Sequence, residues 1–165
     1  MTRFLARYRV RLGFIAALAA LWLATPTPAT LIIGGGLTLV GEALRVWAAG
    51  HLEKGREVTA SGPYRLTRHP LYVGSSIIGV GFAIASASVI VAGLVIVYLV
   101  LTIGSAITRE ESHLTEKFGA AYPEYRDGRT DAVRRFSLAR VQHNREYRAL
   151  LGLALALALL TWKAL

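Results

Sequence analysis

The longest uncharged stretch of this chain sets the main limit on what it can fold into. Residues 71–108 form a run of 38 residues without Asp, Glu, Lys or Arg. A single helix of that length would measure roughly 57 Å, whereas the hydrocarbon core of a bilayer is about 30 Å thick. The stretch therefore predicts two membrane-spanning helices joined by a tight turn, which we place near Ser86, Ala87 and Ser88.

Three further segments are apolar enough to cross a membrane, namely residues 12–24, 31–50 and 147–165. With the hairpin they make about five spans, so we expect an all-α polytopic integral membrane protein. A secretory signal peptide is the alternative for the first segment, because a basic start precedes a short apolar run. Trp22 and Pro26 would make a poor cleavage site, which favours an uncleaved helix.

The charges support this topology. The net charge is +9, and 17 of the 19 Lys and Arg residues lie before the first span or in alternate connections between spans. The positive-inside rule then places the N-terminus in the cytoplasm and the C-terminus outside. Because topology explains the basic balance, we expect contact with membrane lipids and no nucleic acid. The segment 131–142 places apolar residues between arginines and predicts a short interfacial helix, with a plain loop as the alternative.

The residue types exclude several kinds of chemistry. The chain has no cysteine, which rules out disulfides, thiolate metal sites and a cysteine nucleophile. Its four histidines lack the spacing of a zinc site, so we expect no metal.

The segment 62–74 concentrates residues that favour a site. Pro70 suits the first position of a helix, which makes His69 the cap of the span that follows. The start of a helix exposes N–H groups and a partial positive charge, which favours an anion. The alternative is that Arg68 and His69 only anchor the span at the lipid headgroups.

Two other charged groups lie at the ends of predicted spans. Glu110 and Glu111 follow Arg109 where the hairpin ends, and adjacent helical residues point about 100° apart, so only one glutamate can face a given pocket. A solvated helical extension is the alternative. Glu42 and Arg45 are three residues apart in one predicted span and can pair there, either structurally or as part of a site.

Together these motifs resemble the isoprenylcysteine carboxyl methyltransferase family and its phospholipid methyltransferase relatives. The resemblance covers about residues 47–126. It rests on Ser61-Gly62-Pro63-Tyr64, Arg68-His69-Pro70-Leu71-Tyr72-Val73-Gly74, the uncharged hairpin, Glu110-Glu111, and Phe118-Gly119-x-x-Tyr122-x-x-Tyr125.

The resemblance implies one membrane methyltransferase domain over 1–165, with 147–165 as an added helix. It implies S-adenosylmethionine bound on the cytoplasmic side and a lipid-like or isoprenylcysteine-like acceptor from the bilayer. O-methylation of a carboxylate is favoured over N-methylation of an amine. The cofactor-binding residues it implies are Arg56, Glu57, Val58, Thr59, Tyr64, His69, Pro70, Leu71, Tyr72 and Glu110.

We expect three catalytic residues, Arg68, His69 and Glu111. Relatives that methylate prenylcysteine carry a substrate-binding arginine where this chain has Ala106, so Arg45 or Arg109 is predicted to take that role.

Two alternatives stay open. One is an NADPH-dependent reductase similar to the sterol reductases, although Ser75 stands where those enzymes carry an acid. The other is a non-catalytic membrane scaffold. The Arg-rich composition favours a bacterial cytoplasmic membrane.

Overall fold

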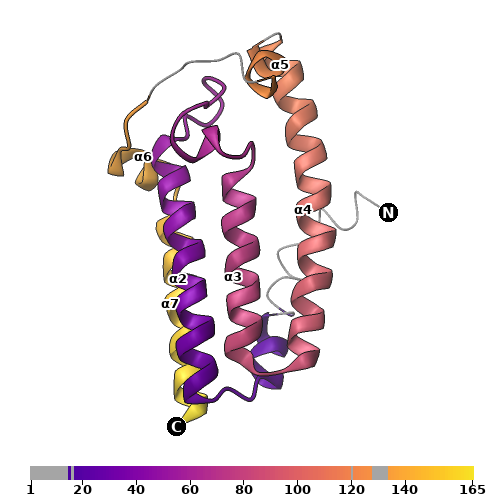
Figure 1. Ribbon diagram of the computed structural model, residues 1–165, viewed down its shortest axis with the longest axis vertical. Helices are drawn as coiled ribbons and strands as arrows, with labels where there is room; N and C mark the ends of the chain where they lie inside the picture. The colour runs from indigo at the N-terminus through magenta and orange to yellow at the C-terminus, as the bar shows by residue number, and fades with distance from the viewer. Residues whose placement is uncertain (1–14, 16, 120, 128–133) are drawn as a thin grey trace.

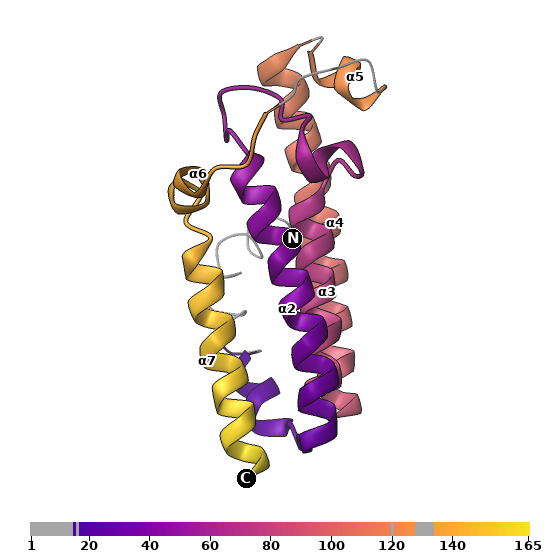
Figure 2. The ribbon, with the colours of Figure 1, turned by 60° about the vertical axis from the view of Figure 1, so that its left-hand side comes forward.

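The computed structural model describes residues 15, 17–119, 121–127 and 134–165, and in that part of the chain it contains helices and no strand. Residues 17–23 are helical and precede the first labelled helix. The labelled elements are α2 (Pro28–His51), η1 (Gly62–Arg65), α3 (Pro70–Ser86), α4 (Val89–Phe118), α5 (Ala121–Arg126), α6 (Leu138–His143) and α7 (Tyr147–Ala164). The four long helices lie roughly alongside one another, with α7 next to α2 (Figures 1 and 2).

The expected all-α membrane fold is confirmed. Among the described residues, α2, α4 and α7 are each long and apolar enough to cross a membrane, and α3 is a shorter apolar helix. Residues 12–14 and 16 of the first expected span, residues 12–24, lie outside the described residues. The total of five spans and their orientation remain predictions.

The hairpin between α3 and α4 turns where the uncharged stretch predicts. α3 ends at Ser86, and Ala87 adopts a left-handed conformation with φ of 50°. The Ser88 hydroxyl then caps α4 by accepting a hydrogen bond from the backbone N–H of Val91 at 3.4 Å. The backbone N–H of Thr25 donates to the Ser86 carbonyl at 2.8 Å, which joins the start of α2 to this turn.

Glycines bring α2 and α3 into close backbone contact. A Cβ at Gly34 of α2 would lie 2.3 Å from the backbone nitrogen of Ala85, and one at Gly41 would lie 2.8 Å from the carbonyl oxygen of Gly74. Small residues permit this approach between membrane helices. Of the three consecutive glycines, only Gly34 faces α3, because a Cβ at Gly35 or Gly36 would meet nothing within 4 Å.

The connections that carry most of the charge gather at the end of the molecule opposite the hairpin turn. There η1 and the loop after α2 lie between α5, at the charged end of α4, and α6, at the end of α2 (Figure 1). The helical elements there are short, with four residues in η1 and six each in α5 and α6.

The expected interfacial helix over 131–142 is wrong in its extent. Residues 131–133 lie outside the described residues, residues 134–137 are not helical, and α6 begins only at Leu138. The reason is that Arg134 forms ion pairs with Glu53 and Glu57, and the backbone N–H of Ser137 donates to the Gly50 carbonyl at 3.0 Å. These contacts hold the segment extended against the end of α2.

Candidate active site

The site begins at the first turn of α3. Pro70 is buried at the first helical position, and His69 precedes it as the N-cap, as the sequence predicts. The expected anion site at this helix start is reduced, however. Pro70 has no N–H, and the N–H groups of Tyr72 and Val73 both donate to the His69 carbonyl, at 3.0 and 3.1 Å.

The three expected catalytic residues converge on one carboxylate. His69 Nε2 lies 3.0 Å from Oε1 of Glu111, and the guanidinium of Arg68 lies 3.2 Å from the same oxygen. Residues 109–118 extend α4 beyond its uncharged part, so Glu111 lies outside the apolar stretch. The hydrogen bond from His69 lowers the pKa of Glu111, and the positive charge of Arg68 acts in the same direction. The carboxylate is therefore held ionised.

Three tyrosines hold the segment around this carboxylate. Tyr125 donates its hydroxyl to the backbone carbonyl of Tyr64 at 2.7 Å, which joins α5 to η1. Burial raises the pKa of Tyr125 to about 12, with the nearby Tyr122 as a smaller cause. Burial also raises the pKa of Tyr64, and the charge of Glu110 adds to the effect. These hydroxyls therefore stay protonated and act as hydrogen-bonding and packing groups, not as bases.

The first position of the Gly-Pro-Tyr motif requires glycine for steric reasons. Gly62 has φ of +59°, and a Cβ there would lie 2.7 Å from the ring of His51. His51 is buried, and its Nδ1 lies 2.9 Å from the Trp47 carbonyl. The loop therefore packs directly on the end of α2, and this packing positions the buried Tyr64.

The expected cofactor strip at residues 56–59 has other partners. Arg56 is exposed, and Glu57 forms an ion pair with Arg134. The buried Thr59 accepts a hydrogen bond from the backbone N–H of Glu53 at 3.2 Å. Within the described residues, none of these contacts joins the strip to the His69–Glu111 pair, and the role of Val58 with its neighbours stays a prediction.

Arg45, one of the two arginines expected to bind the substrate, has several partners within the protein. The Arg45 guanidinium lies 2.6 Å from Oε1 of Glu146, 3.7 Å from Oε2 of Glu42, and donates to the Ser75 hydroxyl. Arg45 thus already has two carboxylate neighbours. Glu146 is buried at the start of α7, and we did not predict it from the sequence, although it is a single acid in an arginine-rich segment before an apolar helix.

Arg109 and Glu110 are both exposed on α4. Of the two adjacent glutamates, Glu111 turns toward His69, whereas the charge of Glu110 acts on Tyr64. This division matches the expectation that the two carboxylates face different groups. Leu71 and Tyr72 follow Pro70 in the first turn of α3, and the Tyr72 ring centroid lies 5.7 Å from that of His69.

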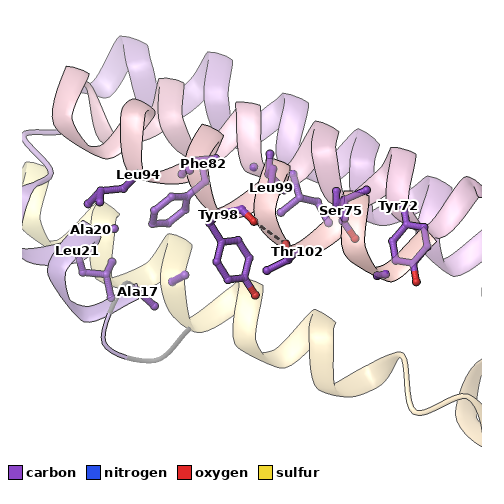
Figure 3. Close-up of a pocket in the computed structure, with 16 residues that line it drawn as sticks. Ala17, Ala20, Leu21, Tyr72, Ser75, Phe82, Leu94, Tyr98, Leu99 and Thr102 are labelled. Atoms are coloured by element: carbon purple, nitrogen blue, oxygen red, sulfur yellow. Dashed lines mark hydrogen bonds between the residues drawn. The ribbon is translucent and has the colours of Figure 1, made fainter. Parts of the chain in front are cut away.

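Two cavities adjoin residues that lie next to the His69–Glu111 pair. A polar pocket of about 410 Å³ includes Arg68 in its lining, together with Tyr64, Arg65, Thr67, Tyr125 and Arg126. An apolar groove of about 770 Å³ runs between α3 and α4, and Tyr72 lies at one end of it (Figure 3). Leu21, Phe82 and Leu94 lie toward the other end. Access of the acceptor from the bilayer was expected from the sequence, whereas this groove was not.

Comparison with known proteins agrees with the motifs. The profile of the phospholipid methyltransferase family matches residues 12–121, which is about two thirds of the chain. The nickel-cobalt-cadmium resistance protein NccN of Alcaligenes xylosoxydans xylosoxydans is 29% identical over 108 residues, covering 64% of this chain and 47% of that protein. The chain thus spans about half the length of this relative, and no solved structure matches it. On the family match, the chain belongs to the phospholipid methyltransferase family of membrane proteins.

Proposed function

We propose that this protein transfers a methyl group from S-adenosylmethionine to a lipid-like acceptor at the membrane surface. The observation that carries the proposal is that the neighbours of the His69–Glu111 pair line two different cavities, Arg68 a polar pocket and Tyr72 an apolar groove. A methyltransferase of this kind must bring a water-soluble donor and a bilayer-soluble acceptor to one point. The basic connections of the chain favour the cytoplasmic side for that point.

The polar pocket suits the donor. Its volume of about 410 Å³ lies within the usual range for small-molecule sites, about 300–1,000 Å³. The guanidinium groups of Arg65, Arg68 and Arg126 suit a carboxylate, and the exposed Glu110 suits an ammonium group or ribose hydroxyls. When bound, S-adenosylmethionine supplies a methyl group on a positively charged sulfur.

His69 and Glu111 can orient the acceptor and move a proton. The ionised Glu111 accepts a hydrogen bond from His69 Nε2, and this contact favours the tautomer whose Nδ1 has a free lone pair. His69 in that form can accept a proton from an amine or hydroxyl acceptor. An ionised carboxylate acceptor needs no base, and then alignment and exclusion of water supply the rate.

The acceptor class follows from the groove. An apolar groove between membrane helices suits a hydrocarbon chain, with its polar head at the Tyr72 end. We retain a carboxylate as the first candidate for the head. The contacts of Arg45 with Glu42 and Glu146 count against that arginine as its partner. Alkaline treatment of a labelled product separates the two chemistries, because methyl esters hydrolyse and N-methyl groups do not.

Calorimetric binding of S-adenosylmethionine to the detergent-purified protein tests the donor. We expect binding by the wild-type protein and a loss of about tenfold or more in affinity for both His69→Ala and Glu110→Ala, since each removes a polar partner. His113→Ala and Glu116→Ala serve as matched controls, because His113 and Glu116 are exposed on α4, the helix that carries Glu110. Each control variant should bind S-adenosylmethionine as the wild type does.

Titration of the same samples with NADPH decides between the alternatives. Binding of NADPH without binding of S-adenosylmethionine would replace the proposal with a reductase. Binding of neither compound would favour a non-catalytic scaffold. Equal losses in the control and test variants would show that the named residues do not form the donor site.

A further inference from the structure

The last helix of the chain lies outside the part that matches the family. The match ends at residue 121, whereas α7 begins at Tyr147. Ala156 of α7 nevertheless lines the apolar groove together with residues of α3 and α4. In Figure 3 the α7 ribbon passes across the open side of the groove, and the Tyr98 side chain points toward it.

We propose that α7 is one wall of the acceptor groove, beside α3, α4 and the helical residues 17–23, and that it limits the thickness of the hydrocarbon chain that the groove admits. This inference rests on the proposed function, because it concerns the acceptor of that reaction. It assigns α7 a part in acceptor selection.

Contacts near both ends hold α7 in place. At its start, Glu146 pairs with Arg45 at 2.6 Å, and Arg45 also donates to Ser75, which itself lines the groove. Near its other end, the Lys163 ammonium donates to the backbone carbonyls of Leu21 and Trp22, at 3.0 and 2.5 Å. The position of Ala156 between these contacts is therefore fixed relative to α3.

Packing strengthens this attachment. Leu160 is fully buried in one apolar cluster with Ala24 and Ala85, which lie at the end of the molecule near the hairpin turn. Ala156 lies one helical turn before Leu160 and is only partly buried, since it faces the groove. These contacts hold α7 beside α2, with Ala156 at the groove.

The groove exists because small residues face it from several helices. Ala20 precedes α2, Gly79 belongs to α3, Ala106 to α4 and Ala156 to α7. Each leaves room that a larger side chain would fill. Along α3 the groove extends from Tyr72 to Phe82, a rise of about 15 Å, which is about half the thickness of a bilayer core. The geometry suits an acceptor whose chain reaches through one leaflet.

Substitution on α7 tests the wall directly. The probe is a palmitoyl lysophospholipid with a photoreactive diazirine in its chain, added to the full-length protein in nanodiscs. Cross-links are mapped to peptides of α3, α4 and α7 by mass spectrometry. For Ala156→Phe we expect cross-linking to the groove residues Tyr98 and Leu99 to fall about tenfold, because pockets discriminate by size to about this degree.

The matched control is Ala158→Phe, which places the same side chain on the same helix at an exposed position. It should leave groove cross-linking within about twofold of the wild type. Equal effects of the two variants, or no effect of Ala156→Phe, would overturn the proposal. Thermal unfolding of each variant identifies misfolding, and in that event Ala156→Leu replaces Ala156→Phe in the same comparison.

A second variant acts in the opposite direction. Tyr98→Ala enlarges the groove opposite α7, so a branched phytanyl probe should gain cross-linking relative to the palmitoyl probe. No gain would count against a thickness limit. Calorimetry with S-adenosylmethionine on the same samples separates this inference from the proposed function. If the wild-type protein does not bind S-adenosylmethionine, the proposed function fails. The cross-linking results alone decide whether α7 limits the thickness of the chain in the groove.

Discussion

Glu111 is the carboxylate on which the polar end of the molecule converges. Its Oε1 lies 3.0 Å from His69 Nε2 and 3.2 Å from the Arg68 guanidinium. The two partners belong to the segment before α3, whereas Glu111 belongs to α4. One ionised side chain therefore links α3 and α4 at the ends opposite the hairpin turn that joins them. A Glu111→Gln variant keeps the size and shape of this side chain and removes its negative charge.

The lowered pKa of Glu111 predicts a pH-dependent stability difference. The charged form stabilises the folded state fully above the ordinary pKa of 4.5, and this contribution is lost as the pH falls through the lower folded-state pKa. The carboxylate is a third exposed, so we expect about 1 kcal/mol or less, or about 2–4 °C in Tm.

Thermal unfolding of wild type and Glu111→Gln in detergent at pH 7 and pH 4 checks this. The wild type should be the more stable at pH 7, and the difference should shrink at pH 4. If the difference in Tm between the wild type and Glu111→Gln is the same at both pH values, the charge of Glu111 does not contribute to stability.

The sequence predicted some of these residue contacts and missed others for physical reasons. Pro70 fixes the helix start locally, so the position of His69 follows from neighbouring residues alone. The pairing of Arg45 with Glu146 joins residues 101 positions apart, and local spacing favoured only Glu42. The ion pair of Glu57 with Arg134 was hidden in the same way, since the two residues are 77 positions apart.

At the scale of elements, the contact between α2 and α3 depends on particular glycines. Gly34 meets the backbone of Ala85, whereas Gly36, two residues later on the same helix, meets nothing within 4 Å. The sequence showed three adjacent glycines and indicated close packing, but helical geometry lets only one of them face α3. The hairpin was predictable to the residue because the bilayer limits helix length, whereas α6 was not, because ion pairs with distant residues set its start.

Alanine substitution distinguishes these glycines. Gly34→Ala should destabilise the protein by about 1–3 kcal/mol, because its Cβ would overlap backbone atoms of α3. Gly36→Ala should be neutral or stabilising by about 0.5–1 kcal/mol, because alanine favours the helix. Denaturant unfolding monitored by circular dichroism measures both variants, and equal stability of the two would contradict the packing described for α2 and α3.

At the scale of the whole molecule, the fold separates two environments along its long axis. The polar pocket and the charged connections lie at one end, and the apolar groove extends from that end between the helices. Arg68 lines the pocket and contacts Glu111, and Tyr72 lines the groove and contacts the ring of His69. We propose that the chain acts as one domain in which α7 completes the groove. The groove itself was not predictable, because it is made by small residues from several helices.

The most direct test of this account is methyl transfer itself. Purified protein in vesicles receives S-adenosylmethionine labelled on its methyl group. Three acceptors are offered in turn, namely a farnesylated cysteine derivative, phosphatidylethanolamine and a total bacterial lipid extract. The account predicts label in the solvent-extracted lipid for at least one acceptor, a loss of about 100-fold in His69→Ala, and wild-type transfer in His113→Ala. Donor binding without transfer to any of the three acceptors, or equal transfer by both histidine variants, would contradict it.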